Sequence, residues 1–253
     1  MMIVKFGGHA MKDSQGLFAK SINGALSNGQ SVIVVHGGGP QINAELAKLQ
    51  IESTFIDGFR FTTEEIFTVV ERVLTQMVGP EVAHNLNAHG VKAQSISAKD
   101  SGILHAEPIE GLGRVGKVSK VDKKNVDALL SQAVVPVIAP IATDVQGGGG
   151  LNINADLAAA AISSAYPDST LIIMTDVAGI YRNWPDQSSL IQDISSGDLA
   201  NIKSTFSDGM LPKVEAVLEA ISAGAQSVRI IDGTNESSFD QALSGTGGTL
   251  VHA

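Results

Sequence analysis

The sequence predicts an α/β protein with a mostly parallel β-sheet that is covered by helices on both faces. Short apolar runs, typical of buried strands, alternate along the chain with longer segments of helical periodicity. The connections are short, and no long linker, low-complexity segment or short-period repeat interrupts the alternation. Such an order is typical of strand–helix–strand units. With 253 residues, 43% of them hydrophobic, the chain suffices for one large domain or for two lobes that share a sheet.

The first part of the chain supplies most of the expected helices. Strands are expected at 2–6, 31–36 and 93–97, helices at 13–27, 40–49, 63–78 and 80–90, and a turn at Asp57-Gly58. Asp13 is expected to cap the first helix, and Pro40 to open the second. The helix at 63–78 has apolar residues that recur at i, i+3, i+4 and i+7 spacing. They are Ile66, Phe67, Val70, Val73, Leu74 and Met77.

The stretch 103–121 differs, because apolar and polar residues alternate there between turn residues, which predicts β-hairpins. It contains Gly111-Leu-Gly113-Arg-Val-Gly116, a match to G-x-G-x-x-G. A dinucleotide site needs a strand before this motif and a helix after it, so the hairpin interpretation argues against one. Further on, strands are expected at 133–141, 170–175, 227–232 and 248–253, and helices at 122–131, from 155 and within 209–223. The glycine-rich loop at 146–156 is where a boundary between two lobes is expected.

Composition excludes several classes of protein. The formal net charge of −9 and the pI of about 5.0 argue against a nucleic-acid binder or a polybasic membrane partner. Because the chain has no cysteine, a disulfide scaffold, a zinc–thiolate site and a thiol nucleophile are excluded. The N-terminus lacks the apolar length of a signal peptide and no apolar run reaches membrane-spanning length, so a cytoplasmic protein is the simplest expectation. The motifs G-x-x-x-x-G-K-[ST], H-E-x-x-H and G-x-S-x-G are absent.

What remains is a set of residues suited to binding anions at the ends of strands. Lys5 precedes Gly7-Gly8, three glycines at 37–39 follow the second strand, and Asp156 and Lys213 lie near helix starts. In an α/β sheet such strand ends can share one edge, where ligands bind. Each residue alone also fits a structural role: Lys5 and Arg60 as solvated cations, Asp156 as an N-cap, Asn152 and Asn154 as loop hydrogen-bonders, and His36 as a hydrogen-bonded turn residue.

In combination these segments resemble the amino acid kinase family. The motifs KFGGHAM, VVHGGGPQI, DGFRFT, NINAD, TDVAGIY and GMLPKV occur in the family's order with family-like spacing, and they span essentially the whole chain. His9 is a departure, because asparagine is common at that position. The resemblance implies a three-layer αβα sandwich with an open, mostly parallel eight-stranded sheet. Within this continuous domain, residues 1–150 would form a lobe for the acyl amino acid and for dimerisation, and residues 151–253 a lobe for ATP.

The implied reaction is the ATP-dependent phosphorylation of the side-chain carboxylate of N-acetyl-L-glutamate, in arginine biosynthesis. The resemblance implies catalytic roles for Lys5, Lys213, Asp156, Gly8 and Gly38. It implies acid-substrate contacts by Gly37, Gly38, Arg60 and Asn152. It implies nucleotide contacts by Asp176, Val177, Ala178, Gly179, Ile180 and Tyr181, and by Thr205, Phe206 and Ser207. Magnesium is expected to be bound by ATP oxygens and water, with no protein ligand assigned.

Two alternatives and an oligomeric state accompany this hypothesis. The chain could be a related kinase acting on aminoadipate on a carrier, glutamate, carbamate or UMP, or a non-catalytic sensor on the same fold. A homodimer that is insensitive to arginine is expected, because the arginine-inhibited members of the family have an extra N-terminal helix and the first strand here begins at about Met2. The helix at 63–78 is the expected dimer contact, since Val69 and Val78 widen its apolar surface. The alternative is a helix buried within one chain.

Overall fold

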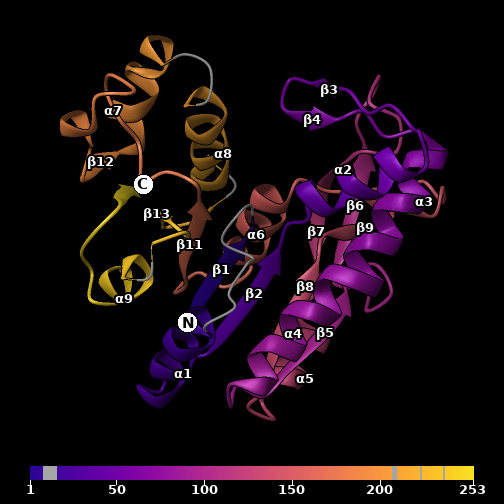
Figure 1. Cartoon of the computed structure of the whole chain (residues 1–253), viewed down its shortest axis with the longest axis horizontal. Helices are drawn as coiled ribbons and strands as arrows, with labels where there is room; N and C mark the ends of the chain where they lie inside the picture. Colours follow the sequence, from indigo (N-terminus) through magenta and orange to yellow (C-terminus); the bar gives the residue numbers. More distant parts are fainter. Residues whose placement is uncertain (8–15, 207–209, 223, 236) are drawn as a thin grey trace. The chain divides into compact units, whose positions relative to one another are not determined.

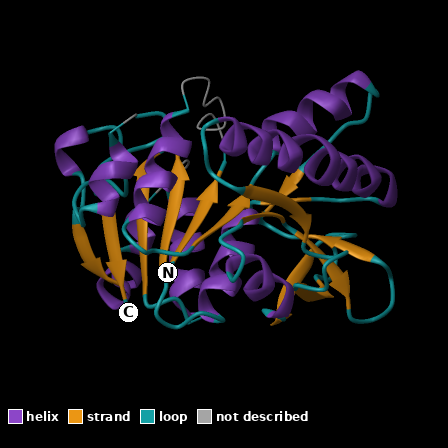
Figure 2. Cartoon of the chain, turned by 90° about the horizontal axis from the view of Figure 1, so that it is seen from below, coloured by secondary structure: helices purple, strands orange, loops and turns teal. Residues whose placement is uncertain are grey.

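A computed structural model describes residues 1–7, 16–206, 210–222, 224–235 and 237–253 of the chain. It divides into two compact units, unit 1 with residues 1–32 and 159–253, and unit 2 with residues 33–158. Figure 1 labels the elements along the chain, and Figure 2 shows helices on both sides of the strands. Gly8 and Ser207, two of the predicted site residues, and Asp13, the expected cap, lie outside the described residues.

Unit 1 contains the first strand together with the C-terminal part of the chain. Its strands are β1 (Met2–Phe6), β11 (Thr170–Thr175), β12 (Asp193–Ser195), β13 (Ser227–Asp232) and β14 (Thr249–His252). Its helices are α1 (Leu17–Ser27), most of α6 (Ala155–Ser164), α7 (Ser196–Asn201), α8 (Leu211–Ser222) and α9 (Ser238–Leu243), with short 3₁₀ turns η3 (Gln187–Ser189) and η4 (Lys203–Thr205). The strand order is β12-β14-β13-β11-β1. Residues 1–32, expected in the N-terminal lobe, fold here because β1 pairs in parallel with β11.

Unit 2 contains the remaining three strands of the large sheet and a smaller sheet of its own. The large-sheet strands are β2 (Val32–His36), β8 (Val135–Ala139) and β5 (Ala93–Ser97), in that order. The four-stranded sheet has the order β10 (Gly150–Asn152), β9 (Ile141–Asp144), β6 (Leu104–Pro108) and β7 (Gly116–Val121). The hairpin β3 (Phe55–Ile56) and β4 (Phe59–Arg60) and the helices α2 (Gly39–Lys48), α3 (Glu64–Arg72), η2 (Val73–Val78), α4 (Gly79–Ala88) and α5 (Lys124–Leu130) complete the unit.

The large sheet confirms the predicted fold class. It has eight strands, and the pairs β1–β11, β11–β13, β12–β14, β2–β8 and β5–β8 are parallel. The pair β13–β14 is antiparallel. The central strands are buried on both faces, as the residues of β2 show: Val32, Ile33, Val34, Val35 and His36 are all buried. This is why these strands are almost continuously apolar in the sequence.

The predicted hairpin at 103–121 is confirmed, since β6 and β7 pair in antiparallel fashion. The glycine motif within it lies between two strands, so it lacks the following helix that a dinucleotide site requires. The predicted strand 133–141 is divided between β8 and the start of β9, and the glycine-rich loop contains the short strand β10, which pairs with β9. The short elements β12, α7 and α9 were not predicted, because segments of three to six residues carry little periodicity.

The helix expected at 63–78 is α-helical only as far as Arg72 and continues as the π-helix η2. The side chain of Thr63 caps its start by accepting a hydrogen bond from the Ile66 N–H at 3.2 Å. Val69 and Val78, which suggested a surface for a second subunit, are 5% and 1% exposed within the single chain. Their burial matches the alternative of a helix covered by its own chain, so the breadth of the apolar surface gives no argument for a dimer contact.

Within the described residues, every helix is too short or too polar to cross a membrane.

Candidate functional site

The glycine loop lies where β2 ends and α2 begins, in unit 2. Gly38 precedes the first residue of α2, Pro40 lies in its first turn, and none of the described side chains caps the helix. The backbone N–H groups of this helix start are therefore available to an anion. A Cβ atom on Gly38 would lie 2.6 Å from Leu74 Cδ2, so the loop depends on the absence of a side chain at that position.

Arg60 is held in a buried fork. The hairpin that carries it turns at Asp57 and Gly58, which both have positive φ angles, 49° and 80°. The Arg60 guanidinium is bound by two side chains: Nη1 donates to Ser53 Oγ at 2.5 Å, and Nη2 donates to Asn43 Oδ1 at 2.7 Å. It also lies over the Phe55 ring, 4.7 Å from the ring centroid. Three neighbours thus fix the direction of the guanidinium.

The charge of Arg60 is what makes this fork a candidate anion site. Arg60 is only 7% exposed, and burial lowers its pKa from the ordinary value. Within the described residues its hydrogen-bond partners are neutral oxygens, and no carboxylate forms an ion pair with it. A buried cation without a counter-charge is unfavourable unless an anion binds beside it. Each terminal nitrogen carries a second N–H, so the guanidinium can still bind a carboxylate through its fork.

Asn152, the other predicted acid-binding side chain, is connected to Arg60 through Thr62. The Thr62 hydroxyl donates to the Arg60 carbonyl at 2.6 Å and accepts from Asn152 Nδ2 at 3.2 Å. Thr62 is fully buried, and the backbone N–H of Asn152 donates to the Arg114 carbonyl at 2.8 Å. The structure therefore brings together two residues that are 92 positions apart in the chain, within one unit.

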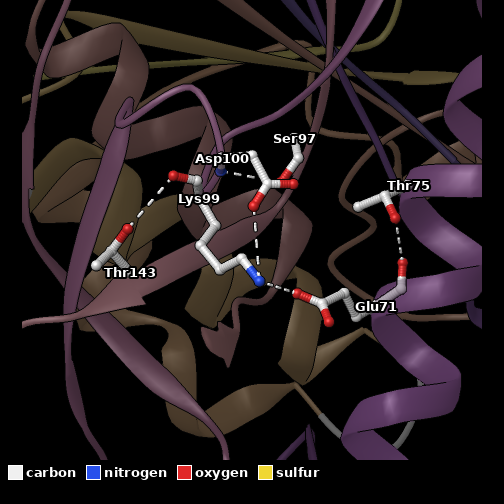
Figure 3. Close-up of polar contacts among 6 residues, drawn as sticks. All are labelled: Glu71, Thr75, Ser97, Lys99, Asp100 and Thr143. Carbon is white, nitrogen blue, oxygen red and sulfur yellow. Dashed lines mark hydrogen bonds and ion pairs between the residues drawn. The ribbon is translucent and has the colours of Figure 1, made fainter. Parts of the chain in front are cut away.

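Figure 3 shows a second set of contacts that fixes α3 beside this region. Lys99 Nζ donates to Glu71 of α3 and lies 3.6 Å from Asp100 Oδ1. The hydrogen bond from Lys99 to Glu71 raises the lysine pKa above its ordinary value and outweighs partial burial. On the other side, the Thr143 hydroxyl donates to the Lys99 carbonyl at 3.4 Å. A Cβ atom on Gly150 would lie 2.5 Å from Phe67 Cζ and 3.1 Å from Lys99 Cδ, so β10 packs closely against the side chains of Phe67 and Lys99.

Asp156 lies in the first turn of α6 and is partly buried. The side chain that caps this helix belongs to Asn154, whose Oδ1 accepts from the N–H groups of Asp156 at 2.9 Å and Leu157 at 3.3 Å. The structural alternative for Asp156, a simple N-cap, is therefore wrong, and Asn154 has that role. Of the predicted catalytic residues, Asp156 and Gly38 belong to unit 2, and Lys5 and Lys213 belong to unit 1.

In unit 1 the predicted lysines are placed by parallel strands. Lys5 of β1 pairs in register with Ile173 of β11, and Asp176 follows directly after the end of β11. Parallel strands bring their carboxyl ends to the same edge of a sheet, so Lys5 and Asp176 share that edge. Lys213, in the first turn of α8, forms an ion pair with Asp176, with 3.4 Å between Nζ and Oδ1.

The ionisation of Asp176 reflects this contact. Burial alone raises the pKa of Asp176, but the Lys213 charge and hydrogen bonds from Thr175 and Lys213 outweigh it, and the pKa lies below its ordinary value. The Thr175 hydroxyl donates to Asp176 Oδ1 at 3.0 Å. Asp176 is therefore an anion at neutral pH that holds a lysine at the edge of the sheet.

The predicted nucleotide loop has an exposed first half and a buried second half. Asp176 is exposed and Val177 and Ala178 are partly exposed, whereas Gly179, Ile180 and Tyr181 are buried. The buried half is anchored by Thr249 of β14, a fully buried residue that the sequence did not indicate. The Ile180 N–H donates to the Thr249 hydroxyl at 2.8 Å, and this hydroxyl donates to the Ile191 carbonyl at 2.5 Å.

Gly179 is fitted to the same threonine, because a Cβ atom on it would lie 2.4 Å from Thr249 Oγ1. Of the second predicted nucleotide segment, Thr205 is exposed and Phe206 is buried. The Thr205 hydroxyl donates to the Ile202 carbonyl at 2.7 Å, which closes the turn η4. The roles of both residues stay predictions.

Sequence reasoning missed several residues that hold the predicted ones, among them Asn43, Ser53, Thr62 and Thr249. Thr62 had a local signal, because it lies two positions after Arg60 in an extended segment and so on the same face. Ser53 lies close to the hairpin that carries Arg60, whereas Asn43 and Thr249 come from other segments. None of these three contacts follows from a sequence period.

Comparison with known proteins places this geometry in context. Residues 1–232 match the amino acid kinase family. The chain is 42% identical over 250 residues to the acetylglutamate kinase of Kineococcus radiotolerans, covering 92% of this chain and 83% of that protein. It is 41% identical over 251 residues to the acetylglutamate kinase of Paenarthrobacter aurescens, covering 92% and 79% of the two chains. Among solved structures, the crystal structure of smu.665 from Streptococcus mutans has a TM-score of 0.85 and 27% identity, covering 100% of this chain and 98% of that one.

The family match covers more than nine-tenths of the chain. It agrees with the sequence motifs, with the mostly parallel sheet and with the glycine loop at the start of α2. This chain belongs to the amino acid kinase family.

Proposed function

We propose that this protein is an acetylglutamate kinase: it transfers the γ-phosphoryl group of ATP to the side-chain carboxylate of N-acetyl-L-glutamate and forms N-acetyl-L-glutamyl 5-phosphate, a step of arginine biosynthesis. The observation that carries the proposal is the 42% identity over 250 residues to a relative of that name. The buried, uncompensated charge of Arg60 supports it, because the substrate's α-carboxylate is an anion that a guanidinium fork can bind.

The proposed chemistry needs charge neutralisation more than proton transfer. The nucleophile is a carboxylate with an ordinary pKa of about 4.3, so it is already ionised at neutral pH and needs no general base. The barrier comes from bringing this anion to an anionic phosphoryl group. In the proposal Lys5 and Lys213 neutralise the phosphoryl group, and the backbone N–H groups of Gly8 and Gly38 donate to its oxygens. Asp156 orients the two lysines.

The two substrates are assigned to different sets of residues. Gly37, Gly38, Arg60 and Asn152 bind N-acetyl-L-glutamate in this proposal, and the segments 176–181 and 205–207 bind ATP. The proposal takes magnesium to arrive with ATP, bound by nucleotide oxygens and water, as is usual for this ion at phosphate sites. When bound to the nucleotide, magnesium neutralises phosphate charge. The proposed compartment is the cytoplasm, because ATP is available there.

The test is an assay of acid-dependent ATP turnover combined with trapping of the product. An acyl phosphate reacts with hydroxylamine to give a hydroxamate, which distinguishes carboxyl phosphorylation from simple ATP hydrolysis. N-acetyl-L-glutamate is expected to give ADP and hydroxamate in equal amounts, with a higher kcat/KM than glutamate, N-acetyl-L-aspartate or 2-aminoadipate. Preference for another acid would identify a related kinase of the family. ATP binding without turnover on any acid would identify a non-catalytic sensor.

The proposal includes a homodimer, supported by the family resemblance and not by the surface of α3. Sedimentation velocity at micromolar concentration tests it, and an arginine titration of activity in the same samples tests the expected insensitivity to arginine. A monomer that is fully active would contradict the dimer and leave the kinase function intact.

A further inference from the structure

His36 occupies the end of β2 directly before the glycine loop and has no solvent exposure. Its Nδ1 atom lies 2.8 Å from the carbonyl oxygen of Gly37. A carbonyl oxygen can only accept a hydrogen bond, so this distance requires the proton of the imidazole to be on Nδ1. The other ring nitrogen, Nε2, then carries the lone pair. It is buried and has no hydrogen-bond partner among the described residues.

The surroundings of Nε2 show why the ring stays neutral and in one place. A Cβ atom on Gly79 would lie 3.0 Å from Nε2 and 2.4 Å from Ser95 Oγ, so the ring packs closely against the first residue of α4. Loss of hydration lowers the pKa of His36 to about 4, despite the hydrogen bond to Gly37 that acts in the opposite direction. At neutral pH the side chain is therefore an uncharged donor with a fixed tautomer, directed at the loop backbone.

The hydrogen bond has a consequence for the next N–H group along the chain. The carbonyl of Gly37 and the N–H of Gly38 belong to the same peptide group. In a trans peptide these two groups lie in one plane and point in opposite directions. Holding the carbonyl therefore also fixes the direction of the Gly38 N–H. Two successive glycines otherwise allow more backbone conformations than any other pair, so this orientation depends on contacts from outside the loop.

A second contact with the glycine loop, at Gly38, comes from the π-helix η2. Leu74 of η2 fills the space beside Gly38, with Cδ2 2.6 Å from the position of a Cβ atom, and Val78 Cγ2 lies 3.5 Å from it. The π-helical turn, a rare form that is frequent at functional sites, thus supplies the described side chains nearest to that position. The peptide between the two glycines is held by His36 at its carbonyl and by η2 at the next Cα.

We propose that His36 is a positioning residue for the phosphoryl-transfer site: its Nδ1–H group holds the Gly37–Gly38 peptide so that the Gly38 N–H is directed at the bound acid and the transferring phosphoryl group. This inference rests on the proposed function, because it takes the Gly38 N–H as a donor to the reacting groups. His36 is not a general base here, since its Nδ1 proton is engaged and its Nε2 is enclosed in the unit.

The test uses substitutions whose amide group takes the place of one ring nitrogen of His36 at a time. An asparagine side chain reaches the position of Nδ1 and can donate to the Gly37 carbonyl, whereas a glutamine side chain reaches towards Nε2. His36→Asn is expected to keep kcat/KM for N-acetyl-L-glutamate within about threefold of the wild type, and His36→Gln to lower it at least about tenfold, as loss of a positioned donor does. The KM for ATP is expected to change little in both. Equal losses in two correctly folded variants would overturn the proposal.

A matched control and a direct measurement separate positioning from stability. His89 makes the same type of contact, from Nδ1 to the Asn85 carbonyl at 2.8 Å, at the exposed end of α4, so His89→Gln is expected to leave kcat/KM unchanged. Nitrogen NMR of the wild type without substrate is expected to show the Nδ1–H tautomer at His36. An Nε2–H tautomer would overturn the proposal whatever the kinetics. A wild type that shows the Nδ1–H tautomer but phosphorylates no acid would refute the proposed function while leaving the histidine contact intact.

Discussion

Lys213 Nζ lies 3.4 Å from Asp176 Oδ1, and this ion pair joins two residues that the sequence assigned to different tasks, one to catalysis and one to nucleotide binding. The lysine side chain is 25% exposed and the aspartate side chain 58%. A pair so exposed contributes little to stability, typically about 0–1 kcal/mol. Its consequence is positional: before ATP arrives, Asp176 keeps the Lys213 ammonium at the carboxyl edge of the sheet in unit 1.

The first prediction is that Asp176 and Lys213 act together. In the wild-type background, Asp176→Asn is expected to lower kcat/KM for ATP by up to about fivefold. This factor corresponds to the free energy that an exposed ion pair contributes. In a Lys213→Ala background the same change is expected to have less than half that effect on a logarithmic scale, because the partner is gone. A double-mutant cycle on kcat/KM measures this coupling. Glu215→Gln, which breaks the surface pair between Lys203 and Glu215, is the control.

Equal effects of Asp176→Asn in the two backgrounds would mean that Asp176 contacts the nucleotide independently of Lys213.

The second prediction concerns the two lysines themselves. Lys5→Ala and Lys213→Ala are each expected to lower kcat by about a hundredfold or more, as loss of one donor to a developing charge does. Both side chains lie at the sheet edge in unit 1, so the fold should be retained. Steady-state kinetics and thermal unfolding of each variant check the two halves of the claim. Lys203→Ala, which removes a surface cation of the same unit, is expected to be silent. Near-normal turnover in a folded Lys5 or Lys213 variant would refute the assigned role.

The strands and the glycine loop could be predicted from the sequence because their causes are local. Buried strands such as β2 are continuously apolar, and Pro40 marks the start of α2. The turn at Asp57-Gly58 follows from the two positive φ angles that this pair tolerates. These features need only a few neighbouring residues to be recognised.

The parts that could not be predicted depend on contacts between distant segments. The helix at 63–78 changes to a π-helix at Val73, although its apolar spacing is regular throughout. Asn43 reaches Arg60, 17 positions later, and Thr249 reaches Ile180, 69 positions earlier, only in the folded chain. Sequence patterns therefore identified the residues that contact ligands in the proposal, and the structure identified those that hold them.

The third prediction separates acid binding from nucleotide binding. Arg60→Ala is expected to raise KM for N-acetyl-L-glutamate by more than about thirtyfold, since losing one partner of a desolvated charge pair costs about 2–5 kcal/mol. The KM for ATP should change little. Arg60→Lys keeps the charge but cannot donate to Ser53 and Asn43 through one planar fork, so it should fail to restore KM. Arg72→Ala, which removes an arginine paired with Glu45, is the control. A rise in the KM for ATP instead would assign Arg60 to the nucleotide.

The fourth prediction concerns Thr249, which anchors the nucleotide loop. Thr249→Val keeps the shape of the side chain but removes the acceptor for the Ile180 N–H and the donor to the Ile191 carbonyl. Leaving a buried donor unsatisfied costs about 1–3 kcal/mol. We expect urea unfolding to show this loss, and the KM for ATP to rise more than the KM for the acid. Thr246→Val, on an exposed threonine of the preceding turn, should change neither. Equal effects on both KM values would show that Thr249 supports the fold alone.

The fifth prediction is a dependence of stability on pH that originates at His36. Burial lowers its pKa to about 4 in the folded protein, whereas the ordinary value of about 6.5 holds in the unfolded chain. Between these values the unfolded chain binds more protons than the folded protein, so the free energy of unfolding rises with pH. The stability that His36 contributes is complete above pH 6.5 and is lost as the pH falls towards 4, by about 3 kcal/mol in total.

Urea unfolding of the wild type and His36→Asn between pH 4.5 and 7.5 measures this loss as a difference in the free energy of unfolding, because the other titrating groups are common to both proteins. The difference in the free energy of unfolding between the two proteins should shrink or reverse towards pH 4.5. A difference that is constant with pH would show that His36 takes up a proton as easily in the folded protein as in the unfolded chain.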